Sequence, residues 1–251
     1  MTSEKTERPR LLVERFVEQM SDEEYARAAR VERALPAISE RAGNADATAT
    51  FARENLSTLR AEGVLGLMVP KQYGGLGGGL RDLAAATFAI GTACPSTALA
   101  YFFHSSAVSR GLLAVEAADA GLFEDEEEAR TVRLFGEKIL KGMGAGQYMA
   151  NFGSESVKTS KGAITISTEA RQTEGGWLVS GVKSFGCNTG VADRYLVTAK
   201  LAGNDNAESI VTFLIPSDAL GIVERHQWNA IGMRATATHG IILNDVFVSD
   251  E

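Results

Sequence analysis

A short segment between residues 181 and 190 holds residue types suited to binding a flat ligand. It places the aromatic Phe185 and the thiol of Cys187 among glycines and short polar side chains. An aromatic face can pack against a planar ring, while hydroxyl, amide and backbone N–H groups satisfy its polar edge. Loops fixed between strands commonly carry such sites. The segment is therefore the first candidate binding site.

Strands on both sides are predicted to hold this segment in place. Alternation at Ile164, Ile166 and Thr168 predicts one strand, and residues 174–176 supply a turn into a returning strand. A further strand is predicted over residues 195–199. The pattern indicates a β-hairpin, a loop that carries the candidate site, and a third strand.

The chain before this region is predicted to be helical. Residues 21–24 have the capping-box form that begins a helix, which is expected to run to the neighbourhood of Pro36. Another helix is predicted over residues 44–62. Further helical patterns follow until Gly142, Gly144 and Gly146, after which the chain has strand patterns. The sequence predicts an α+β chain, with an N-terminal all-α domain over residues 1–141 and a middle β-barrel or sandwich domain over residues 142–251.

Composition argues against several classes of function. The 25 Lys and Arg against 32 Asp and Glu give a net charge of −7, so nucleic acid is not an expected partner. No apolar run approaches the roughly 20 residues that a membrane span needs, and the N-terminus lacks a signal-type apolar segment. Cys94 and Cys187 lack a Cys or His at metal-ligand spacing, so neither a disulfide nor a metal site is expected. The sequence predicts a cytoplasmic protein.

An aromatic cluster at residues 101–104 has two interpretations. Apolar pockets for acyl or aromatic ligands are lined by such side chains, which would make the cluster a wall of a substrate cavity. Aromatic stripes also pack between helices, which would place His104 at the edge of the core with a hydrogen bond. Both interpretations stay open from the residues alone.

Residues 175–199 resemble the middle β-domain of the acyl-CoA dehydrogenase family. The family pattern has a Gly-x-Lys, here residues 181–183, then an aromatic residue, a short polar loop, Ala-Asp and an apolar strand. Three further stretches also resemble the family and occur in its order: residues 63–77 and 94–104 before this region, and residues 231–248 after it. Together they extend the resemblance across most of the chain.

The resemblance implies that FAD is held with its isoalloxazine ring against the β-domain. One contact segment corresponds to residues 148–156 and a second to residues 185–187. The residues expected at the cofactor on this ground are Tyr148, Met149, Ala150, Asn151, Ser156, Phe185, Gly186 and Cys187. Those expected at the substrate are Phe103, His104 and Ser154. The alternative for Phe185 is an ordinary place in the β-domain core.

Two departures from the dehydrogenase pattern alter this expectation. Where the family has Thr-Glu-Pro-Gly followed by Gly-Ser, residues 151–154 read Asn-Phe-Gly-Ser without the proline. Cys187 stands where many dehydrogenases have a hydroxyl residue, and a thiol is a weak hydrogen-bond donor. These departures favour divergent relatives, including flavin-dependent monooxygenases of the same fold that oxygenate aromatic or sulfur-containing substrates.

The resemblance also implies a C-terminal helical bundle after the β-domain. In the family the bundle completes the flavin site, makes oligomer contacts and usually carries the glutamate that removes the substrate α-proton. None of Glu155, Glu169 or Glu174 corresponds to that position, so no catalytic base is assigned. The bundle is expected from a longer form of this protein or from a partner chain, and the protein is expected to be a homo-oligomer or to need such a partner.

Three functions therefore remain open. The preferred one is an FAD-dependent oxidoreductase of fatty acid metabolism that oxidises an acyl-CoA thioester by α,β-dehydrogenation and passes electrons to an acceptor. The second is a flavin-dependent monooxygenase acting on an aromatic substrate with flavin reduced by a flavin reductase. The third is a non-catalytic fragment or subunit that binds no flavin without a helical partner.

Overall fold

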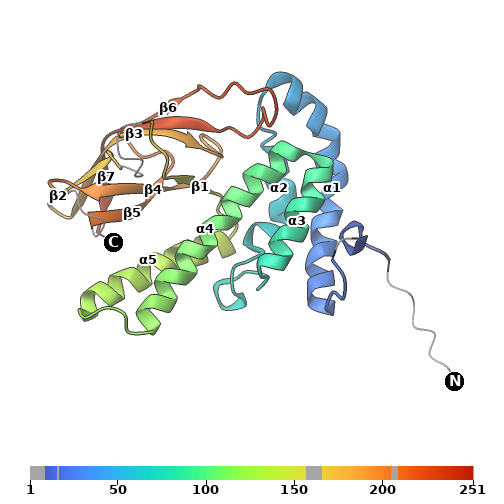
Figure 1. The fold of residues 1–251 in the computed structure, drawn as a ribbon, viewed down its shortest axis with the longest axis horizontal. Helices are drawn as coiled ribbons and strands as arrows, with labels where there is room; N and C mark the ends of the chain where they lie inside the picture. Colours follow the sequence, from blue (N-terminus) through green and yellow to red (C-terminus); the bar gives the residue numbers. More distant parts are fainter. Residues whose placement is uncertain (1–8, 16, 157–165, 205–208, 251) are drawn as a thin grey trace.

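The computed structural model describes residues 9–15, 17–156, 166–204 and 209–250. Within them a helical domain is followed by one curled, mixed β-sheet of seven strands (Figure 1). This order confirms the predicted α+β class. Figure 1 shows α4 (Pro95–Asp119) running between the sheet and the helices α1 (Asp22–Thr48) and α3 (Leu80–Ala93). Of the helices that the structure describes, none has both the length and the apolar character of a membrane span.

The helical domain contains five α-helices and three short 3₁₀ helices within the described residues. They are η1 (Leu12–Arg15), α1 (Asp22–Thr48), α2 (Glu54–Ala61), η2 (Val64–Gly66), η3 (Lys71–Tyr73), α3 (Leu80–Ala93), α4 (Pro95–Asp119) and α5 (Glu126–Gly144). The predicted capping box at Ser21 is confirmed, because Ser21 and Glu24 each bind the other's backbone N–H.

The predicted end of the first helix near Pro36 is wrong. Helix α1 continues through Pro36 to Thr48, although a proline inside a helix removes one hydrogen bond. The face of α1 around the proline is buried by Val31, Ala34 and Ile38, and this packing offsets the lost bond. The predicted helix over residues 44–62 is correspondingly divided between the end of α1 and the separate helix α2.

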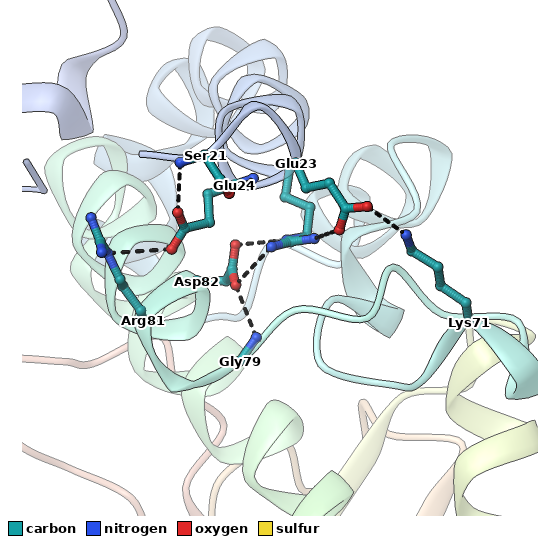
Figure 2. A network of polar contacts seen from close by, with 8 residues as sticks. Ser21, Glu23, Glu24, Lys71, Gly79, Arg81 and Asp82 are labelled. Carbon is teal, nitrogen blue, oxygen red and sulfur yellow. Dashed lines mark hydrogen bonds and ion pairs between the residues drawn. The ribbon is translucent and has the colours of Figure 1, made fainter. Parts of the chain in front are cut away.

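A polar network ties the start of α1 to α3 and to the loop before it (Figure 2). Arg27 donates to the two oxygens of the buried Asp82 at 2.7 and 3.2 Å, and Asp82 accepts the Gly79 N–H at 2.9 Å. Glu23 links Arg27 at 3.3 Å to Lys71 at 3.0 Å. Bidentate arginine–carboxylate bonds fix orientation as well as distance. All members of this network belong to the helical domain.

The sheet has the strand order β1-β4-β2-β3-β7-β6, and β5 pairs with β4. The strands are β1 (Met149–Phe152), β2 (Glu169–Thr173), β3 (Gly176–Gly186), β4 (Arg194–Leu201), β5 (Ile210–Pro216), β6 (Ile222–Arg225) and β7 (His239–Ser249). Strands β1 and β2 run parallel to β4, and the remaining pairs are antiparallel.

The predicted hairpin is confirmed as β2 and β3, but its first strand begins later than predicted. Ile164 lies outside the described residues, and Ile166 and Thr168 precede β2. The backbone N–H of Thr168 donates to the side chain of Glu155 instead of to a neighbouring strand. The Thr168 carbonyl still accepts the N–H of Lys200 on β4 at 2.9 Å, so the chain joins the sheet here through one of its two backbone groups.

One hydrophobic core continues from the helices into the sheet. Tyr101 on α4, Tyr148 before β1 and Tyr195 on β4 are fully buried in the same cluster, and Phe152 packs edge-on against Tyr195 at 4.8 Å between ring centres. The change from helix to strand falls between Gly144 and Met149, beyond the boundary predicted after residue 141. The core thus crosses the predicted domain boundary.

Candidate functional site

The end of β3 contains a β-bulge. Residues 181–186 were predicted to belong to a loop, yet they continue β3, and the turn occupies only residues 187–191. Lys183 and Gly186 are three positions apart on β3, but their partners on β7 are two positions apart, so β3 carries one extra residue. A bulge re-aims the side chains that follow it. As a result, Phe185 and Val182 are both exposed, although two residues three positions apart in a regular strand point to opposite faces of the sheet.

Phe185 is half exposed, at 51%, and lies beside the connection between β6 and β7. Its ring contacts Trp228 edge-on with 6.3 Å between ring centres. Gln227 Nε2 donates to the Ser184 carbonyl at 2.6 Å, and Trp228 Nε1 donates to the Met233 carbonyl at 2.9 Å. This arrangement does not match the alternative that Phe185 is an ordinary core residue.

Cys187 begins a chain of hydrogen bonds with a fixed direction. Its Sγ lies 3.0 Å from Thr238 Oγ1, which lies 2.7 Å from Thr236 Oγ1, which donates to the Met233 carbonyl at 3.0 Å. Since a carbonyl only accepts, Thr238 must donate to Thr236, and the Cys187 thiol must donate to Thr238. Burial raises the pKa of Cys187, which keeps the thiol protonated. The sulfur therefore offers only lone pairs to any other group.

The turn after β3 is attached to α4 through Asn188. Its Nδ2 donates to the Ala100 carbonyl at 3.0 Å and to the Met149 carbonyl at 3.2 Å. The Met149 N–H donates to Nδ1 of His104 at 3.0 Å, so the neutral ring carries its proton on Nε2 and donates to the Leu65 carbonyl at 2.9 Å. Burial lowers the pKa of His104 to about 4, which keeps the ring neutral.

The residues predicted to contact cofactor or substrate fall into two groups. Those that are buried are Tyr148, Met149, Ala150, His104, Gly186 and Cys187. Those with exposed or partly exposed surface are Asn151, Ser154, Ser156, Phe103 and Phe185. The structure places His104 in the packing between α4 and β1, where both of its ring nitrogens are engaged in hydrogen bonds to backbone groups.

The exposed group is connected by hydrogen bonds. Asn151 Nδ2 donates to the Phe103 carbonyl at 2.9 Å, which attaches the end of β1 to α4. Ser184 in the bulge donates its N–H to the Ser154 carbonyl at 3.0 Å, and its hydroxyl bonds that of Ser156. The two predicted cofactor segments, 148–156 and 185–187, are thus brought together at one end of β3.

A buried ion pair lies directly behind this surface, and it was not anticipated from the sequence. Lys183 Nζ donates to Glu155 Oε1 at 2.6 Å, and the two side chains are 0% and 1% exposed. Glu155 also accepts from the N–H groups of Ser167 at 2.6 Å and Thr168 at 3.1 Å, and from both their hydroxyls. Burial alone would raise the pKa of Glu155, but the bonds from Lys183, Ser167 and Thr168 lower it to about 2.

A cavity of about 340 Å³ lies between the end of α1, the start of α4 and the connection to β7. Its lining includes Cys94, Ser96 and Met233, whose carbonyl also ends the chain from Cys187. Within the residues that the structure describes, no cluster of three or more His, Cys, Asp or Glu side chains could hold a metal ion.

Two family models match the chain in the order of its domains. Residues 21–118 match the model described as "Acyl-CoA dehydrogenase, N-terminal domain". Residues 150–246 match the model described as "Acyl-CoA dehydrogenase, middle domain". The two matches cover the helices from α1 to α4 and most of the sheet.

Among curated proteins, the chain is 29% identical to the L-evernosamine nitrososynthase of Micromonospora sp. over 84% of this chain and 47% of that protein. It is 28% identical to the probable acyl-CoA dehydrogenase YngJ of Bacillus subtilis over 84% of this chain and 52% of that protein. The chain spans about half the length of these relatives.

Among solved structures, the fold is similar to KijD3 in complex with FMN and dTDP-3-amino-2,3,6-trideoxy-4-keto-3-methyl-D-glucose. The TM-score is 0.74 at 27% identity, over 92% of this chain and 54% of that one.

Proposed function

Because this chain belongs to the acyl-CoA dehydrogenase family, we propose that it forms the flavin-binding part of a flavin-dependent oxidoreductase. The observation that carries the proposal is the bulge in β3. The bulge exposes the ring of Phe185 and is hydrogen-bonded to the segment that contains Ser154 and Ser156. A bound flavin supplies hydride, single-electron and oxygen chemistry that amino-acid side chains lack. The FMN in the structure of KijD3 supports the assignment of a flavin.

The side chains around the bulge suit a flat heteroaromatic ring. Phe185 offers an aromatic face that would pack against the ring and exclude water. Ser154 and Ser156 are exposed residues, and their hydroxyls would meet the polar edge of the ring. A Cβ at Gly153 would have Thr198 Oγ1 as its nearest neighbour, at 4.0 Å, so the surface between these residues is open. FMN is the first cofactor to test, and FAD, which the family resemblance implies, is the second.

We favour an oxygenase over a dehydrogenase because of the direction of the hydrogen bond that Cys187 makes. Its sulfur can accept an N–H but has no proton to offer, since the thiol donates to Thr238. A reduced flavin carries an N–H at the position where the oxidised ring has a bare nitrogen. The site would therefore favour reduced flavin, which a flavin reductase would supply and which reacts with oxygen. Several relatives carry names that describe synthesis of a nitroso group, in which oxygen is bound to nitrogen.

The substrate on this proposal is a small molecule, and amino sugars are the first class to test. Phe103 and Ser154, which are exposed, and Asn151, which is partly exposed, are proposed to face it. An aromatic substrate is the next class, as the departures of residues 151–154 from the dehydrogenase pattern suggest.

Acyl-CoA dehydrogenation is the second candidate, supported by the relative YngJ. It needs a carboxylate that removes the α-proton. Glu155 is the carboxylate of the proposed cofactor segment, but its pKa near 2 and its bonds to Lys183 make it a poor base. The base would have to come from a helical segment elsewhere in the protein or from a partner chain, which we propose as the cover of the apolar surface around Phe185.

The test is a titration of the chain with FMN and with FAD, each oxidised and chemically reduced, followed by flavin fluorescence and visible absorption. We expect FMN to bind and reduced FMN to bind more tightly. Oxygen-dependent oxidation of an amino sugar is then measured with reduced FMN, and compared with reduction of bound flavin by an acyl-CoA. Flavin reduction by the acyl-CoA would favour the dehydrogenase, and absence of binding for both flavins would overturn the proposal for this chain.

A further inference from the structure

The Gly-x-Lys motif at residues 181–183 is not proposed to contact flavin or substrate. Its glycine and lysine both surround the buried carboxylate of Glu155. Gly181 lies against Thr168, and a Cβ at Gly181 would lie 2.7 Å from the Thr168 Cα. Only glycine therefore allows Thr168 to come close enough to donate its hydroxyl to Glu155 at 2.7 Å. Two positions later, Lys183 donates to the same carboxylate.

Both oxygens of the Glu155 carboxylate have partners. One carboxylate of Glu155 accepts bonds from Lys183, from two backbone N–H groups and from two hydroxyls, all within 3.1 Å. A buried ion pair gives little net stability, because desolvation of both charges opposes their attraction. Convergent bonds of this kind do fix direction, since a carboxylate accepts along its lone pairs. The segment that carries Glu155 is thereby held in one position.

The residues on either side of the ion pair belong to the proposed flavin surface. Ser154 and Ser156 flank Glu155 in the chain, and Ser184 follows Lys183. Ser184 bonds both serines, and its carbonyl accepts from Gln227 in the connection that carries Trp228. The ion pair therefore lies under the point where the serine segment, the bulge and that connection meet.

We infer that Glu155 and Lys183 are positioning residues for a flavin: by pairing inside the sheet, they hold Ser154 and Ser156 against the bulge that presents Phe185. This inference rests on the proposed function. Neither residue touches the ligand, and each acts through its neighbours in the chain. The charges contribute to this geometry, since an uncharged pair would lose the bond between Lys183 and Glu155 and weaken the others, a carboxylate being a stronger acceptor than an amide.

The test compares Glu155→Gln with a matched control in the same chain. Asp82→Asn breaks the buried pair with Arg27, in which the side chains are 7% and 12% exposed, and this pair lies within the helical domain. Both variants should lower the melting temperature. Only Glu155→Gln should weaken FMN binding, by roughly tenfold or more for the loss of a charge-assisted bond, and alter the visible circular dichroism of bound FMN.

Two further variants keep the test decisive if Glu155→Gln does not fold. Ser184→Ala removes the hydroxyl bond to Ser156 without leaving a buried charge, and should weaken FMN binding about threefold with little change in melting temperature. The double variant Glu155→Gln with Lys183→Met removes both charges and should fold with weakened binding.

The outcomes separate this inference from the proposed function. Unchanged FMN affinity in Ser184→Ala and in the double variant, with binding by the unaltered chain, would overturn the inference and leave the proposed function standing. An equal loss of affinity in Asp82→Asn would also overturn it, because the effect would then follow stability alone. If the unaltered chain binds no flavin, both fall together.

Discussion

His104 and Asn188 bind the two polar groups of one residue, Met149. The imidazole Nδ1 of His104 accepts the Met149 N–H at 3.0 Å, and the Asn188 amide donates to its carbonyl at 3.2 Å. The first residue of β1 is thus held between α4 and the turn that follows β3. The two predicted cofactor segments are positioned relative to the helices through this one residue.

The His104 bond makes the stability of the fold depend on pH. The pKa of His104 is near 4 in the folded chain and near 6.5 when the chain is unfolded. Because the folded pKa is depressed, the unfolded state takes up the proton first, and stability falls as pH drops from about 6.5 towards 4. The expected loss is about 3 kcal/mol in the free energy of unfolding, measured by urea unfolding at pH 7 and pH 4.

The control for that experiment is His104→Gln. This variant should be less stable at pH 7, since Gln cannot reproduce both ring bonds, but its stability should change much less between pH 7 and pH 4. Burial and His226 also lower the pKa of His239, so its contribution has the same sign. An unchanged pH dependence in His104→Gln would show that His104 is not its source.

Phe185→Ala tests the aromatic face of the proposed flavin site. Removal of the ring should weaken FMN binding by roughly tenfold or more, because about 1.5 kcal/mol or more of apolar contact is lost. Phe247→Ala is the matched control, since Phe247 on β7 is equally exposed at 51% but pairs with Leu178, far from the bulge on β3 that carries Phe185. Equal affinities in the two variants, measured by flavin fluorescence, would argue against a site at Phe185.

Cys187→Ala tests the direction of the thiol bond. The variant loses a hydrogen-bond acceptor, so affinity for reduced FMN should fall by about fivefold, as expected for one bond of about 1 kcal/mol. Affinity for oxidised FMN should stay nearly constant. Anaerobic titrations of both forms measure the difference, and a fall confined to oxidised FMN would reverse the assigned direction.

Gly186→Ala tests the packing beneath the bulge. A Cβ at Gly186 would overlap the ring of Phe152, and the backbone or the ring would have to move. Overpacking of this kind costs roughly 1–3 kcal/mol in the free energy of unfolding. Gly43→Ala is the control, because Gly43 lies in α1 with nothing within 4 Å of an added Cβ and should gain about 0.5–1 kcal/mol. Urea unfolding of the two variants should give opposite signs.

Helix starts and turns could be predicted where the residues that determine them are neighbours in the sequence. The capping box at Ser21 and the turn between β2 and β3 depend on residues that are neighbours in the chain, and both were predicted. The continuation of α1 through Pro36 depends on burial against other helices, which no local pattern contains. The same reason explains why β3 was predicted to stop before Gly181.

The site was predictable to a smaller degree. Phe185 was identified from the residue types around it, and residues 148–156 through the family resemblance. The bulge that exposes Phe185 depends on the register of β3 with β7, more than fifty residues later. The pair of Glu155 and Lys183 was missed because no spacing rule joins two positions on different segments. The Gly-x-Lys motif was the available signal, since a lysine that a strand buries requires a partner for its charge.

The continuous core determines how the molecule unfolds. Tyr101 of α4 and Tyr148 before β1 share one buried cluster. The backbone of Met149 is bound by His104 from the helices and by Asn188 from the sheet. Separate expression of the helices or the sheet would cut through this cluster and leave those groups in water. Helices and sheet should therefore melt in a single cooperative transition, and a protease should release no stable half.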